Sequence, residues 1–219
     1  MQLVIGNKNY SSWSMRAWVL LTHFQLPFEE IRVPLFTADY QQTLARYSPS
    51  LKVPALIDGE LTLWDSLAIS EYVSEKYLEG AALPADETTR ALCRAYCAEM
   101  HSGFFAIRNQ LPMNCRQRRQ VTLDSALEAE IARIDTLWSQ ALGAADHKGD
   151  YLFGEFSVAD SFFAPVASRF HTYGVELSSL AQRYADQLLK NPAVAAWVEG
   201  AKLEPESLPD FEMGSEISD

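Results

Sequence analysis

The stretch that decides the fold is SLKVPALIDGELTLWDSLAISEYVSEKY, residues 50–77. It contains two short apolar runs, ALIDG and LTLW, which the pattern predicts to be strands. The Asp-Gly pair between them supplies the positive backbone angles that a two-residue hairpin turn requires, so the two strands should be antiparallel neighbours. A helical repeat follows from Ser66 to Tyr77. The stretch therefore predicts a hairpin that leads directly into a helix.

Two places in this stretch could serve a ligand. Val53 and Pro54 stand at a strand start, where a proline cannot donate to the ladder. A cis bond there would expose the backbone of Val53, whereas an ordinary trans proline is the alternative. Asp65 and Ser66 stand where the second strand meets the helix, which gathers a carboxylate, a hydroxyl and free N–H groups at a positive helix end. A plain helix cap is the other interpretation of this pair.

A second stretch, NYSSWSMRAWVLL, begins at Asn9 and is rich in hydroxyls. Its apolar spacing predicts an amphipathic helix over 14–25, with Arg16 away from the apolar face and Ser14 as the N-cap. One serine is enough for a cap. Ser11 and Ser12 then remain in the preceding loop, near free N–H groups and a helix dipole that favour an anion. The surplus hydroxyls indicate a functional site.

The chain as a whole divides into two parts. The first 80 residues alternate strand and helix signals, which is typical of a mixed sheet with helices packed on it. After the Gly- and Pro-containing EGAALPADE, strand signals cease and helical repeats cover 87–110 and 120–142. We therefore expect an α/β domain over 1–80 and an all-α helical bundle over 86–203.

One helix of the second part has a marked start. In FSVADSFFAPVASRF, Ser157 and Asp160 stand three apart, as in an S-x-x-D variant of the capping box. Pro165 falls inside the helix that follows and should kink it unless packing compensates. This segment predicts a central helix of the bundle.

Composition restricts the partners. The 219 residues are 48% apolar and carry a formal net charge of −11, so the chain can bury a sizeable core and repels nucleic acid and anionic lipid. We expect neither as a partner. No apolar run of about 18 residues and no secretory leader stand out, which predicts a cytoplasmic protein.

Two charged segments stand apart from the rest. Residues 204–219, EPESLPDFEMGSEISD, hold six acids and no bases, which predicts a flexible, solvated tail. Arg116, Arg118 and Arg119 form a basic cluster inside an acidic chain, and we expect a solvated loop or helix start there.

Cysteine and histidine spacing does not indicate metal or redox chemistry. Cys93 and Cys97 are four apart on a helical pattern, which is wrong for a redox C-x-x-C pair, and Cys115 makes the number odd. We interpret all three as reduced packing residues. The four histidines lack the spacing of a metal site, so no metal is expected.

Taken together, these motifs resemble the glutathione transferase superfamily over nearly the whole chain. KVPAL stands where that family has its cis-proline loop, DSLAISEYV resembles its glutamyl-binding motif, and FSVADSFFAPV resembles the capping-box helix of its all-helical domain. SSWS is similar to the SSCS of the zeta class, which includes maleylacetoacetate isomerases, with Trp13 in place of the cysteine. The resemblance implies a thioredoxin-like N-terminal domain followed by an all-α helical bundle.

The resemblance also implies roles for matched residues. Ser11, assisted by Ser12 and the helix start, would donate a hydrogen bond to the glutathione sulfur, with Ser14 completing the serine set. Val53 would offer its backbone to the cysteinyl part of glutathione, as an added strand pairs with a sheet edge. Pro54 would hold that edge open.

The remaining glutathione contacts come from the hairpin stretch. Asp65 and Ser66 would hold the γ-glutamyl ammonium and carboxylate, and Lys52 could contact a glutathione carboxylate. A second pocket between the domains would hold an electrophile. Its candidates, for which ion pairing and core packing are the alternatives, are Trp13, His101, Phe105, Arg108 and Arg169.

The expected function is a serine-type glutathione transferase that adds glutathione, as co-substrate, to a small electrophile in detoxification. We expect a homodimer, on the resemblance alone. One alternative is glutathione-dependent cis-trans isomerisation, in which the thiolate adds, a bond rotates and the thiol leaves. Another is a non-catalytic binding protein on the same fold, since fold does not imply function.

Overall fold

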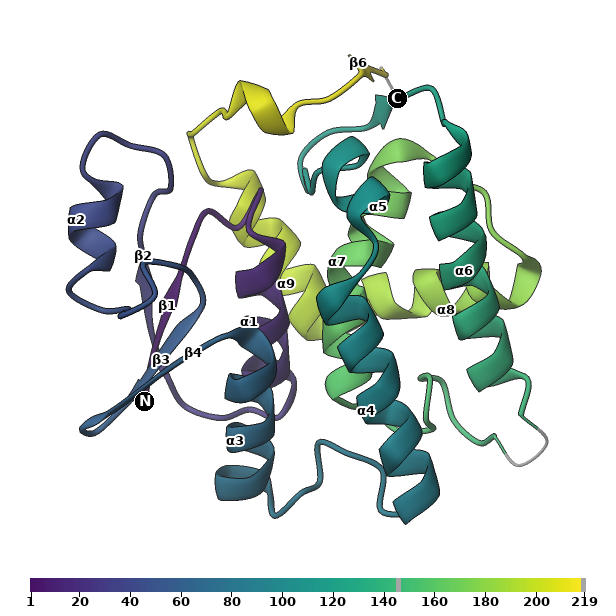
Figure 1. Ribbon diagram of the computed structural model, residues 1–219, viewed down its shortest axis with the longest axis horizontal. Helices are drawn as coiled ribbons and strands as arrows, with labels where there is room; N and C mark the ends of the chain where they lie inside the picture. Colours follow the sequence, from purple (N-terminus) through teal and green to yellow (C-terminus); the bar gives the residue numbers. More distant parts are fainter. Residues whose placement is uncertain (145–146, 218–219) are drawn as a thin grey trace.

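The structure is a computed structural model that describes residues 1–144 and 147–217 (Figure 1). Its first half is built on a four-stranded sheet in the order β2-β1-β3-β4. β1 runs parallel to β2 and antiparallel to β3, and β3 pairs antiparallel with β4 across the predicted Asp-Gly turn. Gly59 in this turn has a φ of +62°, as the hairpin requires. The strands span Gln2–Ile5 (β1), Glu29–Arg32 (β2), Ala55–Asp58 (β3) and Leu61–Trp64 (β4).

The strand register brings three separate segments to one edge of the sheet. Val4 of β1 pairs with Ala55 of β3, and Ala55 pairs in turn with Trp64 of β4. Because β3 is antiparallel to both neighbours, the end of β1, the start of β3 and the end of β4 lie at the same edge. The loop after β1, the residues before β3 and the residue after β4 therefore come together.

Helices of the first half join the sheet to the rest of the molecule. They span Ser12–His23 (α1), Tyr40–Leu44 (α2) and Ser66–Leu78 (α3). α1 packs on α3 and also on α7 and α9 of the second half, and it lies between the two halves in Figure 1. The N-terminus of α1, with its serines, is thus at the boundary between the sheet and the helical bundle.

The second half is a helical bundle, which confirms the predicted fold class. Its helices span Glu87–Ser102 (α4), Phe105–Gln110 (α5), Ser125–Leu142 (α6), Val158–Tyr173 (α7), Ser179–Lys190 (α8) and Pro192–Lys202 (α9). The single helix predicted over 87–110 is wrong. It breaks at Gly103 and Phe104, where Phe104 takes a φ of +61° and Arg108 Nε donates to the Gly103 carbonyl (2.9 Å).

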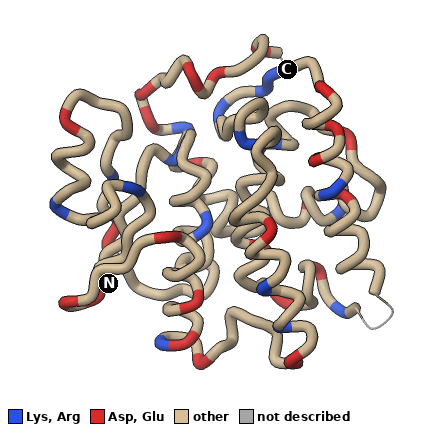
Figure 2. Tube along the Cα trace, in the orientation of Figure 1, with Lys and Arg blue, Asp and Glu red and all other residues tan. Residues whose placement is uncertain are grey.

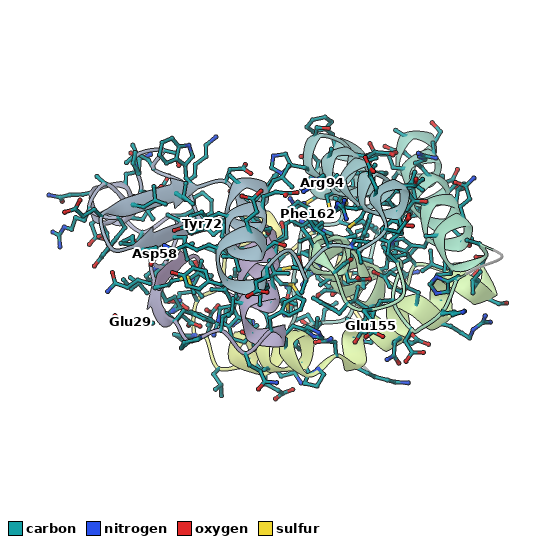
Figure 3. All side chains as sticks on the ribbon, turned by 90° about the horizontal axis from the view of Figure 1, so that it is seen from below. Glu29, Asp58, Tyr72, Arg94, Glu155 and Phe162 are labelled. Carbon is teal, nitrogen blue, oxygen red and sulfur yellow. The ribbon has the colours of Figure 1, made fainter. Side chains whose placement is uncertain are left out.

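α7 begins where the capping box predicts and forms the centre of the bundle. Asp160 Oδ2 accepts from the Ser157 backbone N–H and from Ser157 Oγ, each at 2.8 Å. Its other oxygen accepts from the Tyr184 hydroxyl (2.8 Å). The helix continues through Pro165, and all its residues except His171 are buried. Phe162 of α7, labelled in Figure 3, lies between the two halves.

The hydrophobic core is continuous across both halves. It joins residues of the sheet, such as Leu3 and Leu56, to Trp138 and Phe162 of the bundle through α1. Cys93 and Cys97 are reduced and buried in this core. Within residues 1–144 and 147–217, no helix is long and apolar enough to cross a membrane.

Most described residues of the acidic C-terminal segment are exposed, and the segment also has ordered contacts with the rest of the chain. Its described residues, 204–217, run from the end of α9 across the top of the molecule in Figure 1. They contain a 3-10 turn at Pro209–Phe211 (η1) and the two-residue strand Ser215–Glu216 (β6). β6 pairs with Arg119–Gln120 (β5), a short pairing that the sequence does not signal. Residues 218–219 lie outside the described residues.

The basic cluster explains why this acidic segment is held. Figure 2 shows acidic residues spaced along the C-terminal segment, and basic residues on the chain near its end. Arg119, which is buried rather than solvated, donates to the carbonyls of Glu212, Met213 and Gly214. Arg116 donates to the carbonyl of Glu206 (2.7 Å). Much of the attraction thus goes to backbone carbonyls, which a count of acidic side chains does not reveal.

Candidate active site

The serines of the opening stretch form the N-terminus of α1. Ser11 is the N-cap, because its Oγ accepts from the Ser14 N–H (3.4 Å), and it also donates to Ser14 Oγ (2.8 Å). Ser14 Oγ accepts in addition from the Gly6 N–H (3.1 Å). The prediction that Ser14 is the cap is therefore wrong. The helix begins two residues earlier than expected, at Ser12, and Ser14 lies inside its first turn.

Ser12 has a different environment from its neighbours. Its Oγ accepts from Arg169 Nη2 (3.1 Å), while Arg169 Nε donates to the Leu111 carbonyl (2.7 Å). Both Ser12 and Arg169 are buried. A hydroxyl can donate its own proton while it accepts from a cation, so the Ser12 hydroxyl can serve as a polarised donor.

The hydroxyl of Tyr10, next to Ser11 in the chain, is directed to the C-terminal segment. It donates to Glu212 Oε1 (2.8 Å) and accepts from Arg116 Nη2 (2.9 Å) and the Leu208 N–H (3.1 Å). Its ring lies 5.6 Å from that of Phe211. Among the hydroxyls of this loop, those of the serines are therefore the ones that a ligand at the sheet edge could use.

The Val53–Pro54 peptide bond is cis and stands at the shared sheet edge. The β1–β3 ladder begins at Ala55, so the peptide groups of Val53 lie outside it. Pro54 is buried and Val53 is half-buried, whereas Lys52 is exposed. An extended peptide could pair with the free strand edge at Val53, in the manner of strand addition.

Asp65 and Ser66 begin α3 at the same edge. Asp65 is the N-cap of α3: its Oδ1 accepts from the Leu67 N–H (2.8 Å), and its backbone has a φ of +78°, which side-chain-bearing residues rarely adopt. Its Oδ2 lies 3.3 Å from Nε2 of His101 on α4. Ser66 is fully buried, and its Oγ accepts from Arg16 Nη1 (3.4 Å).

Arg16 is the residue of this site that sequence reasoning misses. Its helical position predicts a place on the polar face of α1, but its side chain is 1% exposed. Its guanidinium lies over the ring of Trp13 (4.3 Å to the centroid) and that of Phe162 (4.5 Å). In the described part of the chain its Nε has no hydrogen-bond partner. The signal that could have found it is its spacing of three from Trp13, which places both on one helix face.

Trp13 gathers cationic and aromatic groups from other helices. The Arg108 guanidinium lies 4.8 Å from the centroid of its ring, and the His101 ring stands edge-on at 5.2 Å. The predicted electrophile residues Trp13, His101 and Arg108 are thus brought together. Phe105 is not brought into this group by any contact we observe, since its side chain points to solvent and is 64% exposed.

The three arginines make this region electropositive. Burial lowers the pKa of Arg16 below its usual range, and the nearby charges of Arg108 and Arg169 lower it further. Burial likewise lowers the pKa of Arg108, and with the Arg108 charge it lowers that of Arg169 to about 10. Arg169 therefore remains a cation at neutral pH. Burial also lowers the pKa of His101, which Asp65 opposes.

The motifs and the geometry agree with comparisons to known proteins. Two family models match the chain, the glutathione S-transferase N-terminal domain over residues 10–76 and the glutathione S-transferase C-terminal domain over residues 116–200. The chain belongs to the glutathione S-transferase family.

Individual relatives place this transferase near the zeta class. Glutathione S-transferase Z2 of Arabidopsis thaliana is 30% identical in an alignment of 192 residues that covers 81% of this chain and 84% of that protein. A probable maleylacetoacetate isomerase of Caenorhabditis elegans is 25% identical over 170 residues, 77% of this chain and 78% of the relative. A glutathione transferase homologue from Burkholderia, solved with bound glutathione, is 29% identical, with a TM-score of 0.67 and coverage of 92% and 97% of the two chains.

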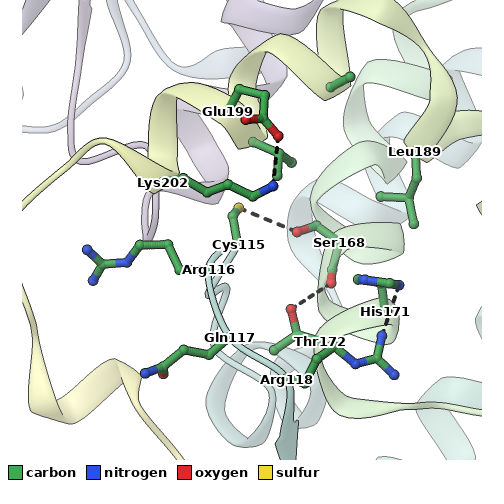
Figure 4. Close-up of a pocket in the computed structure, with 12 residues that line it drawn as sticks. Cys115, Arg116, Gln117, Arg118, Ser168, His171, Thr172, Leu189, Glu199 and Lys202 are labelled. Carbon is green, nitrogen blue, oxygen red and sulfur yellow. Dashed lines mark hydrogen bonds and ion pairs between the residues drawn. The ribbon is translucent and has the colours of Figure 1, made fainter. Parts of the chain in front are cut away.

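A separate cavity of the transferase lies away from these residues. It has a volume of about 600 Å³, is lined from the 115–118 segment, α7, α8 and α9, and contains none of the predicted site residues (Figure 4). Cys115 Sγ lies 3.5 Å from Ser168 Oγ at its wall. Burial raises the pKa of the Cys115 thiol to about 11, so it is not a thiolate nucleophile at neutral pH. Among the described residues, no group of His, Cys, Asp and Glu could hold a metal ion.

Proposed function

We propose that this protein is a serine-type glutathione transferase, in which Ser11 activates the thiol of bound glutathione. The observation that carries the proposal is the convergence of three segments at one sheet edge: the serine N-terminus of α1, the cis Val53–Pro54 peptide and the Asp65–Ser66 start of α3. The γ-glutamyl group would bind at Asp65 and Ser66. The cysteinyl backbone would pair with Val53, which places the sulfur toward the serines.

The glutamyl end has the charges that its ligand requires. The carboxylate of Asp65 can accept from the γ-glutamyl ammonium, because it is 42% exposed and its Oδ2 has one contact among the described residues, with His101 Nε2 (3.3 Å). The buried Arg16, whose Nε has no hydrogen-bond partner among the described residues, can receive the γ-glutamyl carboxylate together with Ser66. Lys52 is exposed and remains a candidate for the glycyl carboxylate.

Ser11 can cap the helix and activate the thiol at the same time. A hydroxyl has one proton to donate and two lone pairs that accept. If the Ser11–Ser14 hydrogen bond reverses, Ser14 donates to Ser11 through both its N–H and its Oγ, and the proton of Ser11 points to the sulfur. Ser14 Oγ still accepts from the Gly6 N–H. The Gly6 N–H and the hydroxyls of Ser11 and Ser14 then each keep a hydrogen-bond partner.

The required stabilisation is within reach of these groups. A free thiol has a pKa of about 8.5, and lowering it by about two requires roughly 2.7 kcal/mol in favour of the thiolate. A charge-assisted hydrogen bond contributes about 1.5–3 kcal/mol and a helix N-terminus about 0.3–1 kcal/mol. The thiolate would then attack the electrophile, and the serine need not ionise.

The electropositive region around Trp13 favours an electrophile that carries a carboxylate. Three buried or half-buried arginines lie in this region, and among the described residues the carboxylates whose charges act on them are Asp65, near Arg16, and Glu130, near Arg108. The same feature supports the second candidate function, cis-trans isomerisation of a maleyl-type acid, since one relative is a probable maleylacetoacetate isomerase. In that reaction the thiolate adds to a double bond, the remaining single bond rotates, and the thiolate leaves again.

Two further properties belong to the proposal. We propose a cytoplasmic homodimer, and the large apolar side chains exposed on β4, α4 and α5 support a partner surface: Trp64, Leu92 and Phe105. Light scattering at micromolar protein should give twice the chain mass. A monomer would contradict this part of the proposal.

The test of function begins with glutathione itself. Calorimetry should detect binding at millimolar glutathione, and activity should be measured with an uncharged aryl chloride, an aryl chloride carrying a carboxylate, and a maleyl-type acid. Transfer to the chlorides supports the transferase, and isomerisation of the acid without net glutathione loss supports the second candidate. Binding without either reaction would favour a non-catalytic protein.

A further inference from the structure

The loop that leads into Ser11 is held from the far end of the chain. Glu204, two residues beyond α9, accepts from the Lys8 N–H through Oε1 (2.7 Å) and from the Asn9 N–H through Oε2 (3.1 Å). The two ends of this contact are about 195 residues apart in sequence. Glu204 is 8% exposed, so a buried carboxylate accepts hydrogen bonds from two consecutive peptide groups of the loop.

The side chains of the same loop have charged contacts of their own, since Lys8 Nζ pairs with Glu30 (2.7 Å) and the Tyr10 hydroxyl contacts Glu212 and Arg116. Further contacts of the loop are uncharged. The Lys8 carbonyl accepts from Trp197 Nε1 (2.9 Å), and Asn9 Oδ1 accepts from the Cys115 N–H (2.8 Å). Among the described residues, Glu204 is the charged group that accepts from the backbone of Lys8 and Asn9, and hydrogen bonds to a charged group contribute about twice as much as neutral ones. The Ser11 N–H in turn donates to the Asn7 carbonyl (2.8 Å). A displacement at Lys8 and Asn9 therefore moves Ser11.

The negative charge of Glu204 would not by itself favour a thiolate. Arg32 Nη1 lies 3.5 Å from Glu204 Oε1. A nearby negative charge would disfavour a thiolate, so removal of the Glu204 charge alone would lower the pKa of a bound thiol. A displacement of the loop would raise that pKa, because the hydrogen bond from the Ser11 hydroxyl to the thiolate would be weaker. The two effects have opposite signs.

We propose that Glu204 is a positioning residue for thiol activation: its carboxylate holds the loop over residues 7–10 so that the Ser11 hydroxyl reaches the glutathione sulfur. This inference rests on the proposed function of Ser11. It assigns a role in the reaction to the acidic C-terminal segment, whose composition alone suggests a solvated tail.

The decisive variant is Glu204→Gln. It keeps the size of the side chain and one acceptor oxygen, but it loses the hydrogen bond to one of the two backbone N–H groups. Glu206→Gln is the matched control. Glu206 belongs to the same segment and pairs with the same Arg32 (2.7 Å), yet it makes no contact with the 7–10 loop among the described residues. Both variants change the net charge by the same amount.

The measurements are the thiolate absorbance of bound glutathione against pH, the dissociation constant of glutathione, and kcat/KM for an uncharged aryl chloride at neutral and alkaline pH. In Glu204→Gln we expect the pKa of the bound thiol to rise by about 0.5–1 from a parent value of about 6.5, so that kcat/KM at pH 7 falls roughly 1.5- to 3-fold with the thiolate fraction and recovers in alkali. Glutathione affinity should stay within about twofold. Glu206→Gln should keep the parent pH profile.

An unshifted or lowered thiol pKa in Glu204→Gln would overturn the proposal, whatever happens to thermal stability. If Glu204→Gln does not fold, Asn9→Ala loosens the same loop from its other side and leaves Glu204 in place. A parent pH profile in Asn9→Ala would then overturn the proposal, because the loop would not control the thiol. The proposed function fails separately, if the parent protein itself does not lower the thiol pKa or if Ser11→Ala leaves it unchanged.

Discussion

The two halves of the candidate site are built in different ways. The glutathione half lies at a sheet edge, where the strand register brings together the serine helix, the cis Val53–Pro54 peptide and the start of α3. The electrophile half is a group of long side chains from α1, α4 and α5 that surround Trp13. Backbone geometry determines the first half, whereas packing between helices determines the second.

This difference should separate the effects of substitutions. Changes at the sheet edge should alter glutathione affinity or the thiol, whatever electrophile is offered. Changes around Trp13 should alter the choice among electrophiles and leave glutathione affinity unchanged. Arg16 links the halves, because it contacts both Ser66 and Trp13.

The largest expected effect is at the glutamyl end. Ser66→Ala should weaken glutathione binding by about 1–3 kcal/mol, because a charged partner loses its hydrogen bond. Ser70→Ala is the control: Ser70 lies one turn further along α3, is also fully buried, and donates to the Ser66 carbonyl (2.8 Å). Calorimetry of both variants measures the difference. An affinity that is the same in Ser66→Ala as in the parent would remove Ser66 from the site.

A smaller, selective effect is expected at Arg108. Arg108→Met should lower kcat/KM for a carboxylate-bearing aryl chloride about tenfold more than for an uncharged one, which corresponds to about 1.4 kcal/mol. The glutathione KM should not change. Arg133→Met, at an exposed arginine paired with Glu99, serves as the control. Equal losses with both electrophiles would mean that Arg108 matters through the carbonyls it caps at the end of α4.

A further effect concerns stability at the start of α1. Ser14→Ala removes the acceptor of the Gly6 N–H and of the Ser11 hydroxyl, and should lower the free energy of unfolding by about 1–3 kcal/mol, since each of the two hydrogen bonds contributes about 0.5–1.5 kcal/mol. Denaturant unfolding followed by tryptophan fluorescence measures it. No loss of stability would show that the Gly6 N–H finds another partner.

Sequence reasoning predicts the sheet-edge half because its signals are local. The Asp-Gly hairpin turn, the proline at a strand start and the capping box of α7 each depend on residues a few positions apart, and the elements appear where these signals stand. The predicted fold class, an α/β domain followed by a helical bundle, rests on local signals of the same kind and is confirmed.

What sequence reasoning does not predict depends on distant contacts. Arg16 occupies a polar-face position of α1 yet is buried, and its guanidinium lies over the ring of Phe162, 146 positions further along the chain. Glu204 belongs to a segment whose acidity indicates solvation. Its carboxylate is instead buried and accepts from two backbone N–H groups near the other end of the chain. The N-cap of α1 moves from Ser14 to Ser11 because helix propensity does not distinguish between adjacent serines.

The central claim, that Ser11 activates the glutathione thiol, is tested most directly by the pKa of that thiol in its enzyme complex. Thiolate absorbance at saturating glutathione should be titrated in the parent, Ser11→Ala and Ser12→Ala. Because the thiolate is the reactive form, activity rises with pH through this pKa. Ser11→Ala should raise it by about 1–2, or about 1.4–2.7 kcal/mol, with glutathione affinity nearly unchanged. An unshifted pKa in Ser11→Ala, with a raised one in Ser12→Ala, would contradict the claim and assign activation to the hydroxyl that Arg169 contacts.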